Sequence, residues 1–114
     1  MFTAYIIVTL IAAAANAFSA TLDFIRYNQV LINMAKASVP DSWITMLGLL
    51  KAAGALGLLA GIAVPLIGTA AAVGLVLFFV GAIITHLRAG DYSFGLAVVF
   101  LLLAIAALVL RLAS

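Results

Sequence analysis

Four long apolar stretches dominate the chain, and each is long enough to cross a lipid bilayer as an α-helix. They run over residues 2–22, 42–62, 66–87 and 93–112. A membrane-spanning helix needs about 20 apolar residues, because each residue adds about 1.5 Å along the axis. The strict alternation of apolar and polar positions that is typical of a membrane β-barrel is missing. The pattern therefore predicts an all-α, integral membrane four-helix bundle.

The connection between the first two spans, residues 23–41, is the longest and most polar part of the chain. Its polar residues alternate with apolar ones, which predicts a short amphipathic helix lying at the membrane interface. Pro40 ends this segment, and Asp41 or Ser42 is expected to cap the second span. The second connection, residues 63–65, allows only a hairpin turn. No repeat or linker is visible, so a single transmembrane domain is predicted over residues 1–114.

Composition supports a membrane location and excludes several kinds of chemistry. Hydrophobic residues make up 69% of the chain and charged residues 7%, which leaves too little charged surface for a soluble domain. The chain has no cysteine and one histidine, so it cannot supply thiol chemistry, iron–sulfur ligands or a three-histidine zinc site. We expect no metal site, no intrinsic cofactor and no nucleic-acid partner.

The few basic residues predict the orientation of the chain in the membrane. Arg26, Lys36 and Arg88 lie in the first and third connections, whereas Arg111 lies near the opposite end. Cytoplasmic loops carry an excess of Lys and Arg. This bias places the first and third connections in the cytoplasm and both termini outside.

Lys51 is the most informative residue, because it stands near the middle of the second span. A lysine at the centre of a spanning helix costs roughly 2.5–3.5 kcal/mol on insertion scales. Gly48, Gly54, Ala55 and Gly61 share a sector of this helix with Lys51, and small residues let membrane helices approach closely. We therefore expect Lys51 to point into the bundle, with its ammonium leaning toward the first and third connections.

Several polar residues are predicted to meet Lys51 on that side. The first span carries Thr9, Asn16 and Asp23 at heptad spacing, and the third span ends near His86. We predict a half-buried polar pocket that binds a ligand through Asn16, Asp23, Lys51 and His86. Lys51 would bind an anion or a carbonyl, Asp23 would balance its charge, and His86 would exchange a proton or donate a hydrogen bond.

A purely structural interpretation of the same residues stays open. Lys51 and Asp23 would then form an ion pair that sets the helix register, and Asn16 would join helices by hydrogen bonding. His86 would anchor the interface, and Asp91 is expected to cap the fourth span. Four aromatic residues are interpreted as belt residues at the membrane surface: Tyr5, Tyr27, Trp43 and Tyr92.

Two motifs give the chain a family resemblance. They are LKAAGALGLLAG over residues 50–61 and GLVLFFVGAIITHLRAGD over residues 74–91. With the four spans and the polar first connection, the whole chain resembles the DoxX-like family of small bacterial membrane proteins. The resemblance implies a multi-pass protein of the bacterial plasma membrane. Some members of the family are subunits of membrane oxidoreductases, including complexes for quinone-linked thiosulfate oxidation and thiol-redox defence.

Three functions are compatible with these features. The first is a non-catalytic subunit that anchors or assembles a membrane complex and binds a quinone or a lipid head group near Lys51. The second is a quinone-linked oxidoreductase subunit that receives electrons from another chain. The third is a small anion transporter that uses Lys51. The expected partners are the lipid bilayer and either further copies of the chain or a larger membrane complex.

Overall fold

The computed structural model describes residues 2–91 and 94–114, and these residues form only helices and their connections. Four helical segments are long and apolar enough to cross a membrane, and a short helix follows the first of them. The segments are Phe2–Phe24, Asp41–Ala60, Pro65–Arg88 and Gly95–Ala113. The predicted all-α membrane bundle is therefore confirmed. The elements are α1 (Phe2–Phe24), α2 (Asn28–Lys36), the 3-10 turn η1 (Asp41–Trp43), α3 (Ile44–Ala60), α4 (Pro65–Arg88) and α5 (Gly95–Ala113).

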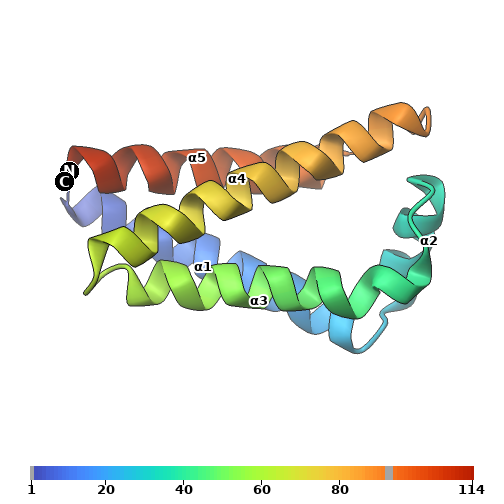
Figure 1. Cartoon of the computed structure of the whole chain (residues 1–114), viewed down its shortest axis with the longest axis horizontal. Helices are drawn as coiled ribbons and strands as arrows, with labels where there is room; N and C mark the ends of the chain where they lie inside the picture. Colours follow the sequence, from blue (N-terminus) through green and yellow to red (C-terminus); the bar gives the residue numbers. More distant parts are fainter. Residues whose placement is uncertain (1, 92–93) are drawn as a thin grey trace.

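The four long helices pack as an antiparallel ring in the order α1, α3, α4, α5. Each of them contacts two neighbours, and α1 closes the ring by packing against α5. The start of α1 and the end of α5 lie at one end of the molecule, whereas α2 and the end of α4 lie at the other (Figure 1). Arg26, Lys36 and Arg88 thus share one end of the bundle, as predicted, and Arg111 lies at the opposite end.

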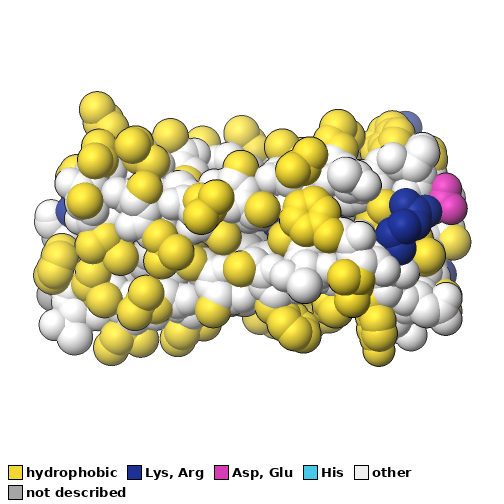
Figure 2. Space-filling view, turned by 90° about the horizontal axis from the view of Figure 1, so that it is seen from below, with side chains coloured by type: hydrophobic (Ala, Val, Ile, Leu, Met, Phe, Trp, Pro, Cys, Tyr) yellow, Lys and Arg dark blue, Asp and Glu magenta, His cyan; other side chains and the backbone are white. Residues whose placement is uncertain are grey.

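The outer surface is apolar along most of its length. Hydrophobic side chains cover the face drawn in Figure 2, and most of the visible charge gathers at the end where α2 lies. Leu66, Leu96 and Leu112 are each at least 70% exposed. Such exposure of leucine is unfavourable in water but not among the acyl chains of a lipid bilayer. The chain is a multi-pass membrane protein with four candidate spans.

The spacing between α3 and α4 increases from the hairpin turn toward the end of the molecule where α2 lies. A Cβ on Gly61 would overlap the backbone of Gly68, so the two helices touch there. The side chains that face each other become larger with distance from the turn. Next to the turn both are glycines, then glycine faces alanine and leucine in succession, and farthest from the turn lysine faces phenylalanine. The helices diverge accordingly (Figure 1). The facing pairs are Gly61 with Gly68, Gly57 with Ala71, Gly54 with Leu75, and Lys51 with Phe78.

The predicted cap of the second span is wrong. Neither Asp41 nor Ser42 caps α3, because both belong to η1, and Trp43 precedes α3 without a capping side-chain hydrogen bond. Asp41 instead lies 3.7 Å from Arg26 in an exposed ion pair. Phe94 occupies the cap position of α5 and makes no capping side-chain hydrogen bond. That Asp91 caps this helix stays a prediction.

The aromatic residues predicted to form a belt differ in their exposure. Trp43 and Tyr27 are about half exposed at the α2 end, as expected of belt residues. Tyr5 is only 2% exposed, because its ring lies inside the bundle with the Arg111 guanidinium 4.5 Å above it. Tyr92, and residue 93, where the fourth span was expected to begin, lie outside the described residues.

Candidate functional site

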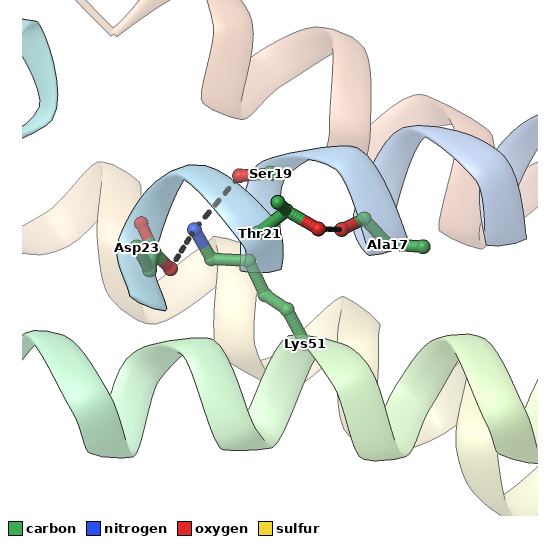
Figure 3. A network of polar contacts seen from close by, with 5 residues as sticks. All are labelled: Ala17, Ser19, Thr21, Asp23 and Lys51. Atoms are coloured by element: carbon green, nitrogen blue, oxygen red, sulfur yellow. Dashed lines mark hydrogen bonds and ion pairs between the residues drawn. The ribbon is translucent and has the colours of Figure 1, made fainter. Parts of the chain in front are cut away.

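The Lys51 side chain leaves α3 and reaches toward the last turns of α1 (Figure 3). Its Nζ lies 2.8 Å from Asp23 Oδ2 and donates a hydrogen bond to Ser19 Oγ over 2.9 Å. The side chain of Lys51 is 13% exposed and that of Asp23 is 3% exposed. The lysine is turned inward, and Asp23 is its counter-charge, both as predicted.

Local sequence explains why these three groups meet. Ser19 and Asp23 are four residues apart on α1, so their side chains project from one face. Gly48 lies one turn before Lys51 on α3, and a Cβ there would crowd Asp23 Cβ at 3.1 Å. The glycine therefore permits the close approach of α1 that brings the carboxylate within reach of the ammonium.

The Lys51–Asp23 contact cancels two charges inside the bundle. Asp23 Oδ2 has no well-directed hydrogen bond among the described residues, so the contact is mainly ionic. An ammonium has three N–H donors. Ser19 accepts one of them, and the Asp23 carboxylate lies beside the ammonium as its counter-charge, which leaves at least one N–H without a further acceptor in the described part of the chain.

The predicted polar stripe on α1 faces the interior. Thr9, Asn16 and Asp23 are at most 2% exposed. Asn16 Nδ2 donates to the Ala12 carbonyl over 2.9 Å, whereas its Oδ1 has no partner within the described residues. Asn16 is not among the residues that line the cavity described next, so the structure does not bring it to the other three predicted site residues.

A cavity of about 430 Å³ lies beside Lys51, at the end of the bundle where α2 lies. One wall is polar and comes from α1 and α3, with Ser19, Asp23 and Lys51. The opposite wall is aromatic and comes from α4 and α5. Residues of α2 and of the segment after it line the end of the cavity. The remaining lining includes Met34, Ala37, Trp43, Leu50, Phe78, Phe79, Gly81, His86 and Phe100.

His86 lines this cavity, but its direct partner is not the Lys51–Asp23 pair. Its Nδ1 lies 2.9 Å from Asp91 Oδ2, and both side chains are mostly buried. Gly90 has a φ of +71°, a left-handed conformation that suits glycine and folds the chain back onto the last turn of α4. This reversal brings Asp91 to the imidazole.

Three residues of the site were not among the predicted ligands: Ser19, Phe78 and Asp91. Ser19 could have been found from its position one turn before Asp23. Phe78 could have been found from the tight turn at residues 63–65, because the antiparallel register places it opposite Lys51, with Nζ 5.8 Å from the ring centroid. Asp91 reaches the site through the left-handed conformation of Gly90, which brings its carboxylate back to His86.

The arrangement provides hydrogen-bond donors and aromatic surface rather than a metal site. Among the described residues, no group of three His, Cys, Asp or Glu side chains could hold a metal ion. Asp23, Lys51 and His86 surround one cavity, and Asn16 lies apart from it. Whether these residues bind a ligand stays a prediction.

The comparisons with known proteins agree with the fold. A family model described as "DoxX-like family" matches residues 7–109, which is nearly the whole chain. No curated protein and no solved structure matched the chain.

Proposed function

The chain belongs to the DoxX-like family, and from this premise we propose that it is a non-catalytic membrane subunit that binds a quinone or a similar neutral, carbonyl-bearing lipid. Its cavity would hold the head of this ligand. The observation that supports the proposal is the remaining N–H donor of Lys51 beside a largely apolar cavity of about 430 Å³. Such cavities, with a few placed polar groups, are typical of small-molecule sites.

The charges around the cavity favour a neutral head group. Asp23 already balances Lys51 at 2.8 Å, so an anion would meet a carboxylate beside the ammonium. A lipid phosphate or the cargo of an anion transporter is therefore less suited to this wall. A carbonyl oxygen needs only one N–H donor and leaves the ion pair in place.

The aromatic wall favours a flat head group. Phe79 packs against Phe78 with ring centroids 4.9 Å apart, and against Phe100 with centroids 5.2 Å apart. All three rings line the cavity opposite the polar wall. A planar, conjugated ring could stack on this surface while its carbonyl accepts a hydrogen bond from Lys51.

A role as a quinone-linked oxidoreductase subunit is the second candidate, and the His86–Asp91 pair favours it. When the carboxylate holds Nδ1–H, the other ring nitrogen of the imidazole can accept a proton. His86 could then exchange a proton with a quinone in the cavity, and a partner subunit would supply the electrons. Both candidates require a larger membrane complex. Purification from native membranes that recovers this chain alone would argue against both.

Filling the cavity tests the proposal without touching the polar residues. Gly81 lines the cavity, and a Cβ there would have no heavy atom within 4 Å, so Gly81→Leu should project into the space. Gly74→Leu is the matched control, because Gly74 has equally open surroundings on the same helix but does not line the cavity.

The binding assay uses menadione, a quinone ring without a tail, and the protein in lipid nanodiscs. Trp43 is the single tryptophan and lines the cavity, so bound quinone should quench its fluorescence. We expect saturable quenching in the wild type and in Gly74→Leu, and about tenfold weaker binding in Gly81→Leu, a cost of about 1.4 kcal/mol. Equal quenching in both variants, or no saturation in the wild type, would contradict the proposal.

A further inference from the structure

On one side the cavity is lined by the parts of α3 and α4 that diverge from each other. The graded packing of these helices ends where Lys51 faces Phe78, and the helices diverge beyond this pair (Figure 1). Leu50 on α3 and Gly81 on α4 border the divergent region, and both line the cavity. Leu50 is 50% exposed, and the space around Gly81 is open, so both also face the exterior.

The end of the cavity toward the aqueous phase is lined by α2 and the segment after it. Met34 and Ala37 belong to this lining and are at most 8% exposed. Leu50 lies six residues into α3, or about 9 Å along the helix, and is therefore level with acyl chains rather than with water.

We infer that the ligand is a lipid with a long hydrocarbon tail that enters sideways from the bilayer between α3 and α4. Its head lies beside Lys51, and its tail passes between Leu50 and Gly81 into the membrane. This inference rests on the proposed function, which places the head group in the cavity whatever the route by which the ligand enters. The free-energy cost of placing a tail here is small, because the tail extends from the cavity directly into the hydrocarbon of the bilayer.

Two quinones with related rings separate these possibilities. Menadione has no tail, whereas phylloquinone carries a phytyl tail. Leu50→Trp places bulk in the opening, and Leu49→Trp is its matched control, because Leu49 is 57% exposed but does not line the cavity. Bound quinone is measured by native mass spectrometry from nanodiscs, at equal mole fractions of each quinone in the lipid.

We expect Leu50→Trp to weaken phylloquinone binding about tenfold and to leave menadione binding within about twofold of the wild type. Leu49→Trp should change neither. Leu50→Ala, which widens the opening without added bulk, should speed the association of phylloquinone. If Leu50→Trp binds phylloquinone as tightly as the wild type and Leu50→Ala associates with it no faster, the lateral entry is wrong and the proposed function stands. If the wild type binds neither quinone, the proposed function itself fails.

Discussion

At the scale of single residues, the Lys51–Asp23 pair dominates the energetics of the site. Each charge would be costly alone inside a membrane bundle, and the pair persists because the two groups lie 2.8 Å apart. Ser19 supplies a hydrogen bond that the ammonium would otherwise lose on leaving water. The pair is thus a structural contact and also the polar wall of the cavity, so the two sequence-based interpretations of Lys51 are compatible.

Removing one partner of this pair should destabilise the fold. Lys51→Met leaves the Asp23 carboxylate buried without a cation and should lower the free energy of unfolding by roughly 3–5 kcal/mol. The double variant Lys51→Met/Asp23→Asn should recover most of this loss, because it removes both charges. Unfolding by SDS in mixed micelles measures the effect.

Lys36→Met is the control for the loss of a positive charge. Lys36 is exposed on α2, so its replacement should change the free energy of unfolding by less than about 0.5 kcal/mol. If Lys51→Met were as mild as Lys36→Met, the ion pair would contribute little to stability.

At the scale of helices, the size of the facing side chains controls where α3 and α4 touch and where they part. Glycine at both positions near the turn allows backbone contact, and the larger residues at Lys51 and Phe78 hold the helices apart. In lipid, such close packing replaces the hydrophobic effect as a source of association. The cavity follows from this gradient, because nothing comparable to the glycine contact joins the helices beyond Lys51.

The glycine contact near the turn should be sensitive to a single methyl group. Gly61→Ala places a Cβ against the Gly68 backbone, which cannot move as a flexible side chain would. We expect a loss of about 1–3 kcal/mol from overpacking. Gly74→Ala, on the open face of α4, should be neutral or stabilising by up to about 1 kcal/mol. Equal thermal stability of the two purified variants would contradict the graded-contact interpretation.

At the scale of the whole molecule, the distribution of charge over the two ends predicts the topology. Most of the charge lies at the α2 end (Figure 2), and this end carries Arg26, Lys36 and Arg88. Arg111 is held at the opposite end, over the Tyr5 ring and near the Gly61 carbonyl. The positive-inside rule therefore predicts that α2 and the cavity lie on the cytoplasmic side of the membrane.

Cysteine labelling tests this orientation directly, because the natural chain has no cysteine. A membrane-impermeant maleimide added to intact cells should label Ser114→Cys and spare Lys36→Cys, and permeabilised cells should show labelling of both. Gly74→Cys, on the lipid-facing surface of α4, should stay unlabelled in both cases. The reverse pattern for Lys36→Cys and Ser114→Cys would place the termini in the cytoplasm.

Much of this architecture could be predicted from the order of residues alone. Hydrophobic length defines the four spans to within a few residues, because lipid leaves the backbone no partner outside its own helix. The inward direction of Lys51 follows from the glycines and alanines on its face. Asp23 could be named as its partner because antiparallel order places the end of α1 beside the start of α3.

Other features depend on where neighbouring helices lie, and only the tertiary structure decides them. Tyr5 is buried because α5 brings Arg111 over its ring, and Asp91 meets His86 because Gly90 reverses the chain. Asn16 lies on the predicted face, but the cavity does not reach it. Periodicity specifies which face of a helix turns inward, because that depends on one helix alone. The cavity exists only because two helices diverge, and their divergence is a property of the packed pair.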